Sequence, residues 1–352
     1  MKAQYSVSAA ELRKRFYGRI SEKNLTPLWE VLDALVPPHP RPRITSALWR
    51  FTDVYPSVLE AGELITAQEA ERRVLILENP AARGASRITQ SLYAGLQLIL
   101  PGEIAPAHRH AQSALRLLLK GSGAYTAVDG ERVPMHRGDF IITPPFTFHD
   151  HGNLGSEPVT WLDGLDIPIV EFFDAGFGEK GSAASQTATK RVGDSLARYG
   201  HNMVPMDYSP ARSEPTKLVV YPYAQTRSAL SGIAHGPIDA HWGYKLRYIN
   251  PATGESPMLT IGAAAQYLPA GFNSAPYRST DSTIYVCLEG HGNAQIDDTR
   301  YQFEENDVFV VPSWATLGLN APGDVILFSF SDRPVQRALG LWREEKLRAP
   351  QR

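Results

Sequence analysis

The chain has 352 residues, of which 43% are hydrophobic and 20% charged, and its formal net charge is −2. This length and composition are typical of a globular protein with room for two domains, and the nearly balanced charge argues against nucleic acid as a partner. No apolar run is long enough to cross a bilayer and the first residues lack a signal-peptide core, so we expect a cytoplasmic protein without a membrane partner.

Residues 1–86 are predicted to form a mostly helical N-terminal region. Ser8 and Glu11 have the spacing of a capping box, and Thr26 is the expected N-cap of a second helix with Pro27 at its first position. The proline-rich stretch at 36–43 ends that helix. The segment 66–80 begins with a helical pattern and changes to an apolar strand.

Two later regions, residues 87–175 and 256–340, read as series of short strands separated by Gly and Pro turns. Such a pattern predicts a mainly β protein built from sandwiches or barrels. Residues 176–255 begin with a stretch rich in Gly, Ala and Ser and are predicted to be a linker region with a brief helix near 226–236. Residues 341–352 form a short charged tail. Cys287, the single cysteine, lies in an apolar strand pattern that predicts a buried thiol.

The two β regions repeat one another. Gly121 precedes Asp139 by 18 positions, and Gly290 precedes Asp307 by 17. Both aspartates are followed by a proline five positions later. The repeat predicts two copies of one β domain within the chain.

The strongest chemical signal is a set of three histidines. His108 and His110 are two residues apart in a predicted strand, so their side chains project to the same face. His149 follows another strand and a Pro-Pro turn, which can return the chain to the same place. Three imidazoles suit iron(II), zinc, copper or nickel, and their spacing predicts a metal site.

The spacing of these residues resembles the two motifs of the cupin superfamily. The resemblance implies a bicupin fold, with two double-stranded β-helix (jelly-roll) barrels after an N-terminal helical region. One departure is that Phe146 replaces the second glycine of the second motif. The matching positions are Gly102, His108, His110 and Gly121 in the first motif and Gly138, Pro144, His149 and Asn153 in the second.

A second departure concerns the metal ligands themselves. Ala114 occupies the place where most metal cupins have a glutamate. A neutral three-histidine set leaves positions open for a chelating substrate and O2, as in non-haem iron(II) oxygenases. In the second repeat the ligand positions align with Tyr277, Ser279 and Leu317, so we expect that barrel to lack a metal and to serve packing or assembly.

Longer segments resemble gentisate 1,2-dioxygenases and their relatives. They include SLYAGLQLILPGEIAPAHRHAQSALRLLLKG, TPPFTFHDHGN, WLDGLDIP and PYRSTDSTIYV, and the likeness extends from about residue 25 to 340. The resemblance implies an Fe(II)-dependent enzyme that cleaves gentisate with O2 to maleylpyruvate, between the carboxyl- and hydroxyl-bearing ring carbons. It also implies a homotetramer that acts in the catabolism of aromatic acids.

The same resemblance suggests roles for six further residues. Arg116, six positions after His110, would hold the substrate carboxylate if it shares a strand face with that histidine, and Gln97 would donate to the same group. His151 is the expected acid or base, with rival metal ligation as the alternative. Asp163 would accept from the 5-hydroxyl of gentisate or cap a turn. Arg72 and Tyr93 would line the pocket, unless they are an ordinary helix-end arginine and strand aromatic.

Other functions remain open at this level. Cleavage of salicylate or 1-hydroxy-2-naphthoate is an alternative within the same enzyme class. The shape of the pocket decides which of these substrates is accepted. A non-enzymatic metal-binding cupin sensor is an alternative of another class, but no basic helix-turn-helix pattern is present. A cupin isomerase would favour the full set with glutamate, against which Ala114 argues.

Overall fold

The computed structural model describes residues 8–348, which belong to two compact units, Met1–Arg41 and Pro42–Arg352. In the first unit, α1 (Ala9–Ser21) begins at Ser8, whose side chain accepts a hydrogen bond from the Glu11 backbone nitrogen at 3.2 Å. The prediction that Thr26 caps α2 (Leu28–Leu35) is wrong. Pro27 is itself the N-cap, because its backbone is extended and helical geometry begins only at Leu28.

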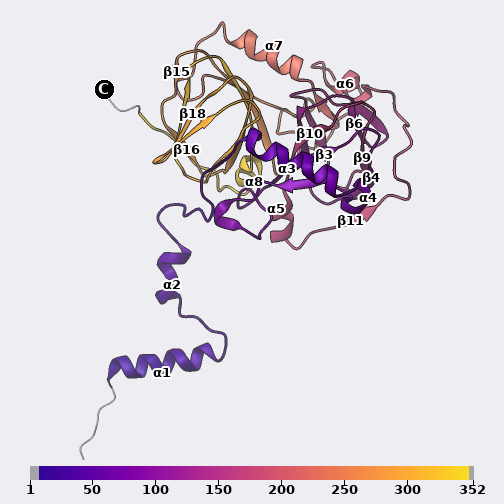
Figure 1. The fold of residues 1–352 in the computed structure, drawn as a ribbon. Helices are drawn as coiled ribbons and strands as arrows, with labels where there is room; N and C mark the ends of the chain where they lie inside the picture. The colour runs from indigo at the N-terminus through magenta and orange to yellow at the C-terminus, as the bar shows by residue number, and fades with distance from the viewer. Residues whose placement is uncertain (1–7, 349–352) are drawn as a thin grey trace, which may run out of the picture. The chain divides into compact units, whose positions relative to one another are not determined.

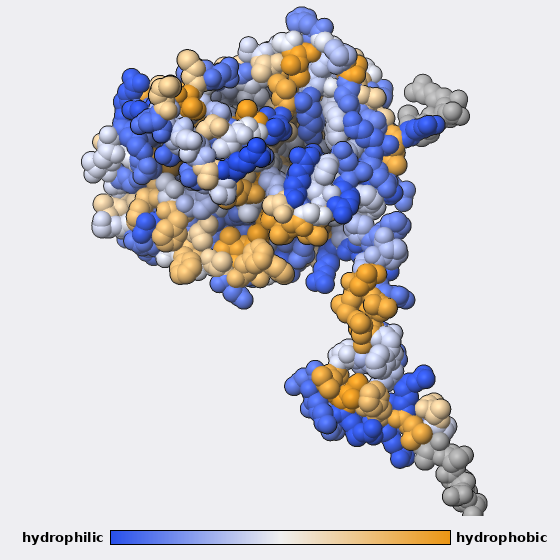
Figure 2. All heavy atoms as spheres, turned by 180° about the vertical axis from the view of Figure 1, so that it is seen from behind, coloured by the Kyte–Doolittle hydropathy of each residue, from blue (hydrophilic) through white to orange (hydrophobic). Residues whose placement is uncertain are grey.

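Neither helix of the first unit has a buried residue. Apolar side chains instead gather on its surface, as the orange spheres of this segment show (Figure 2). Within residues 8–348 no helix has the length and apolar character needed to cross a membrane. The large exposed apolar residues on α1 and α2 are Leu12, Phe16, Leu28, Trp29, Leu32 and Leu35.

The second unit contains two β-barrels, seen as separate groups of strands in Figure 1, so the mainly β fold is confirmed. The first barrel has a sheet in the order β12-β8-β5-β10-β3-β2 and another in the order β11-β4-β9-β6-β7. Its strands are β2 (Val74–Ile76), β3 (Tyr93–Ile99), β4 (Ile104–His110), β5 (Ala114–Lys120), β6 (Ala124–Val128), β7 (Glu131–Pro134), β8 (Phe140–Thr143), β9 (His149–Asn153), β10 (Val159–Leu165), β11 (Gly178–Lys180) and β12 (Val220–Tyr221).

The second barrel repeats this arrangement. Its sheets have the orders β1-β20-β17-β22-β14-β13 and β19-β18-β21-β16-β23, and β15 pairs with β21. Its strands are β1 (Ala47–Trp49), β13 (Tyr244–Arg247), β14 (Gly262–Leu268), β15 (Phe272–Asn273), β16 (Tyr277–Ser279), β17 (Thr283–Glu289), β18 (Gly292–Ile296), β19 (Thr299–Phe303), β20 (Val308–Val311), β21 (Leu317–Ala321), β22 (Val325–Ser331) and β23 (Glu344–Lys346).

Short helices connect and cover the barrels. The helix expected near 226–236 is confirmed as α7 (Tyr223–Ile233), and the helix-then-strand pattern at 66–80 is confirmed by α4 (Ala67–Ala70) and β2. Cys287 is buried, as predicted. The remaining helices are α3 (Phe51–Leu64), η1 (Pro80–Ala82), α5 (Ile167–Phe172), α6 (Asp194–Tyr199) and α8 (Arg333–Ala338).

Strand alternation explains how one segment serves two cores. In β5, Leu115, Leu117 and Leu119 face the core between the barrels, whereas Leu118 faces the interior of the first barrel. Successive side chains of a strand point to opposite faces, so every second residue is available to line a site inside the barrel. Arg116 lies on that inner face.

Each barrel takes an edge strand from the segment that precedes the other barrel in the chain. β1, which precedes the first barrel in sequence, pairs with β20 of the second, and β12, which follows the first barrel, pairs with β8 of the first. Matching buried aspartates secure the helices that follow these strands. Asp307 accepts from the Phe51 backbone nitrogen at 2.7 Å, and Asp139 accepts from the Tyr223 backbone nitrogen at 2.8 Å. The structural repeat is therefore longer than the repeat visible in the sequence.

The segment predicted as a linker, residues 176–255, contains β11, α6, β12, α7 and β13. These elements are shared between the two barrels, since β12 extends a sheet of the first and β13 extends a sheet of the second. The domain boundaries given by the sequence remain a prediction.

The core between the barrels yields a test of the fold. A Cβ at Gly164, in β10, would lie 2.8 Å from the Phe330 ring and 3.0 Å from Leu115. We expect Gly164→Val to lower the free energy of unfolding by about 1–3 kcal/mol through overpacking. Gly176→Val is the matched control, because no atom lies within 4 Å of a Cβ placed there. Equal stability of both variants by urea denaturation would contradict this packing.

Candidate metal centre and substrate pocket

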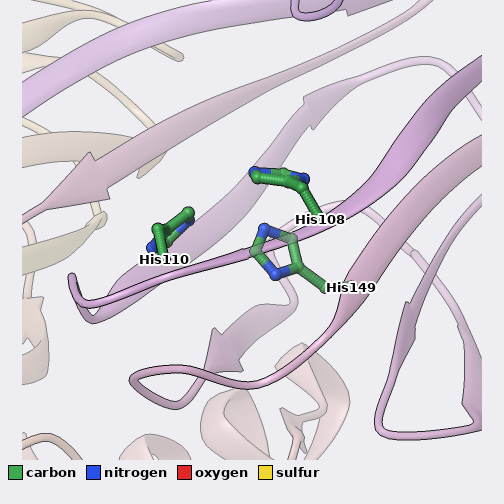
Figure 3. Close-up of side chains that lie close together, drawn as sticks. All are labelled: His108, His110 and His149. Carbon is green, nitrogen blue, oxygen red and sulfur yellow. The ribbon is translucent and has the colours of Figure 1, made fainter. Parts of the chain in front are cut away.

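Three histidines converge inside the first barrel. His108 and His110 lie on β4, and His149, at the start of β9, pairs in register with His108. Their ring centroids are 4.2 Å apart for His108 and His149, 4.9 Å for His110 and His149, and 5.2 Å for His108 and His110. One nitrogen from each ring lies within 4.8 Å of the others (Figure 3). The geometry therefore brings together the three ligands that the sequence predicted.

Backbone carbonyls set the tautomers of two of these rings. His110 Nδ1 lies 2.9 Å from the Gln112 carbonyl oxygen, and His149 Nδ1 lies 3.0 Å from the Thr147 carbonyl oxygen. A carbonyl only accepts, so each Nδ1 donates and the lone pair remains on Nε2. His149 Nε2 is buried without a hydrogen-bond partner in the described structure. An unpaired, inward-facing nitrogen of this kind fits a divalent metal ion.

The surroundings also keep the rings neutral. Burial lowers the pKa of His108 to about 3, with the Arg72 guanidinium as the next cause. Burial and Arg116 lower the pKa of His110 to about 4, and the same causes hold the pKa of His149 well below its usual range. Metal binding requires neutral imidazole, so these ligands need not lose a proton at neutral pH.

The equivalent positions of the second barrel confirm the alignment made from the sequence. Tyr277 on β16 pairs with Leu317 on β21, as His108 pairs with His149 in the first barrel. Tyrosine and leucine offer no imidazole at these places. The described residues contain one candidate cluster of metal ligands, and it is the histidine set of the first barrel.

A buried ion pair faces the histidines from the other sheet. Arg116 on β5 pairs in register with Asp163 on β10, and Arg116 Nε lies 3.5 Å from Asp163 Oδ1. Arg116 Nη1 donates to Thr143 Oγ1 at 2.6 Å. Arg116 does not share a strand with His110, since β4 and β5 belong to different sheets. It points into the barrel from the sheet opposite the one that carries the histidines.

Asp163 lies in the middle of a strand, so it does not cap a turn. It accepts a hydrogen bond from Trp161 Nε1 at 3.0 Å. Burial raises the pKa of the Asp163 carboxyl to about 6, and Arg116 and Trp161 oppose that rise. The carboxylate is therefore mostly ionised at pH 7 but close to its titration range.

Gln97 and Tyr93 lie on β3, beside Asp163's strand. Gln97 is buried and pairs in register with Trp161, and Tyr93 is half-buried. The Tyr93 hydroxyl lies 3.0 Å from the place where a Cβ of residue 95 would stand, so Gly95 makes room for it. Burial and the Asp163 charge raise the pKa of the Tyr93 phenol, which keeps it a hydrogen-bond donor at neutral pH.

His151 lies two residues beyond His149 on β9 and is fully buried. Its ring packs against Trp161 with a centroid distance of 5.4 Å, and neither ring nitrogen has a partner among the described residues. It is not in the three-residue ligand cluster. Burial, with Arg116 next, holds its pKa well below the usual range, so it is a neutral ring beside the site.

Arg72 lies at the edge of the site. Its Nη2 donates to the Pro106 carbonyl oxygen at 2.5 Å and contacts His108 Nδ1. Burial lowers the pKa of Arg72 to about 10, so the guanidinium stays charged at neutral pH. A cavity of about 740 Å³ opens here, with Arg72, His108 and His110 in its walls. Arg72 does follow the end of α4, as the alternative says, but it is half-buried against β4 and does not simply face solvent.

Two site residues were missed in the sequence. Thr143 orients Arg116, and Trp161 contacts both His151 and Asp163. Trp161 is two residues before Asp163, and this even spacing within a strand is the signal that places both on one face. No comparable signal identifies Thr143, because its contact depends on which strands become neighbours.

Comparison with known proteins identifies similar chains. The cupin domain family model matches residues 95–165. Gentisate 1,2 dioxygenase 1 of Aquipseudomonas alcaligenes is 49% identical over 95% of this chain and 96% of its own length. Gentisate 1,2-dioxygenase of a Streptomyces species is 36% identical over 96% of each chain. The crystal structure of salicylate 1,2-dioxygenase from Pseudoaminobacter salicylatoxidans with gentisate has a TM-score of 0.90 and 32% identity, covering 98% of this chain and 96% of the other.

The ligand set can be tested by removing one imidazole. We expect His149→Ala to lose metal at neutral pH, with a drop in affinity larger than the roughly 10- to 100-fold typical for loss of an outer partner. Metal content after dialysis, measured by mass spectrometry, gives the result, and far-UV circular dichroism checks the fold. His136→Ala is the control, because that side chain is 78% exposed and outside the cluster. Full metal retention by His149→Ala would remove His149 from the ligand set.

Proposed function

This chain belongs to the gentisate 1,2-dioxygenase family of ring-cleaving cupin enzymes, and on that basis we propose that it cleaves gentisate with O2 to maleylpyruvate. The bond broken is the one between the carboxyl- and hydroxyl-bearing ring carbons. The observation that carries the proposal is the pairing of three neutral histidines on one sheet with the buried Arg116–Asp163 pair on the other.

The proposed metal is iron(II), held by His108, His110 and His149. The neutral ligands and the orphaned His149 Nε2 support a divalent ion, and the dioxygenase relatives favour iron among the metals that accept imidazole. Bound iron(II) would supply Lewis-acid polarisation of a chelating substrate and the redox chemistry needed to use O2. Side chains of the first barrel are proposed to bind the substrate, orient it and transfer protons.

Arg116 is the proposed carboxylate anchor. Its position is fixed by Thr143 and Asp163, and a fixed guanidinium loses little freedom when a carboxylate binds. Gln97, buried on the neighbouring strand face, supplies a second polar contact for the same carboxylate. Arg72 adds a second positive charge beside His108. Together these residues favour an anionic substrate and orient its ring toward the histidines.

Asp163 and Tyr93 are the proposed contacts for the second ring hydroxyl of gentisate. The Asp163 carboxylate accepts and the Tyr93 phenol donates, so the pair can bind a hydroxyl in both of its hydrogen-bonding roles. His151, neutral and without a partner, is the proposed acid or base that exchanges a proton with the reacting groups. Trp161 packs against His151 and excludes water from that side.

Salicylate and 1-hydroxy-2-naphthoate are the alternative substrates. They lack the 5-hydroxyl, so they would leave Asp163 without the partner proposed for it. A 5-hydroxyl that donates to this carboxylate would add one hydrogen bond to a charged group, worth about 1.5–3 kcal/mol, and this contact favours gentisate. The sensor alternative falls away, because the relatives that match nearly the whole chain are enzymes.

The quaternary structure and the location of the protein remain proposals. The apolar residues exposed on α1 and α2 support a homo-oligomer, since exposed apolar clusters commonly mark protein interfaces. A homotetramer is the assembly that the sequence resemblance implies. Cytoplasmic residence is likewise proposed from the sequence alone.

Oxygen uptake tests the proposed function. Protein reconstituted with iron(II) under anaerobic conditions is mixed with oxygenated gentisate, salicylate or 1-hydroxy-2-naphthoate. We expect fastest uptake with gentisate, one O2 per substrate, and the absorbance of a ring-opened keto acid. Faster turnover of salicylate would change the preferred substrate, and no uptake with any of them despite bound iron would overturn the proposal.

Replacing Arg116 tests the carboxylate anchor. We expect Arg116→Gln to raise KM for gentisate about 10- to 100-fold, because it removes a charge-assisted contact inside the barrel. Steady-state kinetics gives the result, and iron content shows that the ligands remain in place. Arg300→Gln, which removes an exposed arginine of the second barrel, is the control. Unchanged KM and kcat in Arg116→Gln would exclude the anchoring role.

The Asp163 carboxyl predicts a pH dependence. Its pKa of about 6 means that it loses its proton, and becomes an acceptor, as the pH rises through that value. We therefore expect kcat/KM for gentisate to rise between about pH 5 and pH 7. Asp163→Asn should lower the plateau and remove this limb, whereas Asp298→Asn, at an exposed site, should leave it. An unchanged limb in Asp163→Asn would assign it to another group.

A further inference from the structure

A cavity of about 800 Å³ lies in the second barrel, apart from the metal centre. Its walls come from β13, β14, β17, β22 and α8. Residues with small side chains line the strands at this place, which is why the space is not filled. They include Gly262, Ala264, Thr283, Ser329 and Ser331.

Strand register shows that this cavity corresponds to the Arg116–Asp163 side of the first barrel. Ala264 pairs with Ser329 between β14 and β22, just as Gly95 pairs with Asp163 between β3 and β10. Tyr285 pairs with the same serine, as Arg116 pairs with Asp163. The second barrel therefore has a cavity at the place that corresponds to Arg116 and Asp163 of the first, although it has Tyr277 and Leu317 in place of His108 and His149.

The cavity is strongly basic. Asp281, one of its two acidic residues, is already bound by Arg333 Nε at 3.1 Å and by Trp342 Nε1 at 2.9 Å. The other, Glu255, lies 3.9 Å from Arg212. Five basic residues against these two leave a formal excess of three positive charges, and they are Arg212, Lys245, Arg247, Arg333 and Arg337.

Lys245 is the most informative of these residues. Its Nζ lies 4.8 Å from the centre of the Trp242 ring and 5.3 Å from that of the Tyr285 ring. No carboxylate of the described residues forms an ion pair with it, although its side chain is half-buried. Burial, with the Arg333 charge next, lowers the pKa of Lys245 to about 7, and Asp281 only partly opposes this. A half-buried amine without a counter-charge can bind an anion.

We infer that the cavity of the second barrel binds a small organic carboxylate, with Lys245 as its anchor and Arg247 and Arg337 as further positive contacts. The cavity is large enough for an aromatic acid or a short dicarboxylate, which are the kinds of molecule that the proposed reaction consumes and produces. Without histidines at the ligand positions, the second barrel binds such an anion through cations alone. It is therefore a second binding site and not a second centre of ring cleavage.

The test is calorimetric titration of the full-length, iron-loaded protein with maleate in the absence of air. Maleate carries two carboxylates on a short unsaturated chain and lacks the hydroxyl that a chelating substrate needs. We expect Lys245→Met to weaken one maleate site at least about tenfold, as loss of a half-buried charge should. Lys217→Met is the matched control, because Lys217 also lies over an aromatic ring, 4.7 Å from the centre of Tyr208, but outside the cavity.

Three outcomes would overturn the inference: no maleate binding, equal binding by both lysine variants, or equally tight binding of inorganic phosphate at the same ionic strength. Arg337→Gln, on the exposed face of α8, repeats the test should Lys245→Met fail to fold. A maleate site in the first barrel would respond to Arg116→Gln and not to Lys245→Met. The readout is binding, so the result does not depend on whether gentisate is the substrate.

Discussion

The buried pair of Arg116 and Asp163 is the interaction on which the first barrel's chemistry depends. Enclosing a guanidinium and a carboxylate is costly, and a single contact at 3.5 Å returns only part of that cost. Burial, with the Arg116 charge as the next cause, lowers the pKa of His110, His149 and His151 and keeps these rings neutral. A metal cation bound by the histidines would use their free nitrogen lone pairs. An anionic substrate would give the Arg116 guanidinium a second negatively charged partner beside Asp163.

Two barrels of the same topology thus carry different interiors. In the first, polar residues on facing strands surround the histidines. In the second, the interior is largely filled by aliphatic and aromatic side chains, and the remaining hollow is basic. The exchange of β1 and β12 ties each barrel to a strand and helix from the other half of the chain. The two barrels also share a core, in which Gly164 of the first packs against Phe330 of the second. A substitution that disturbs the packing of one barrel can therefore alter the stability of the other.

The sequence predicts the mainly β fold and the three metal ligands, for physical reasons. The metal ligands were predictable because the two-residue spacing of His108 and His110 fixes a strand face, and the motif spacing places His149 on the neighbouring strand. The inward direction of Arg116 was anticipated, but its sheet was not, since a turn separates β4 from β5. Thr26 was wrong as a cap because Pro27 enters α2 with an extended backbone. The pairing of β1 with the second barrel, the pairing of β12 with the first, and the contact of Thr143 with Arg116 all join segments that are far apart in the sequence. Local sequence patterns do not predict such contacts.

The most direct test of the central claim is a crystal structure of the iron(II)-loaded protein with gentisate, grown without oxygen. The account predicts one metal ion per chain, bound by the imidazoles of His108, His110 and His149, with the gentisate carboxylate at Arg116 and its 5-hydroxyl at Asp163. A metal bound elsewhere, or a substrate whose carboxylate points away from Arg116, would contradict it.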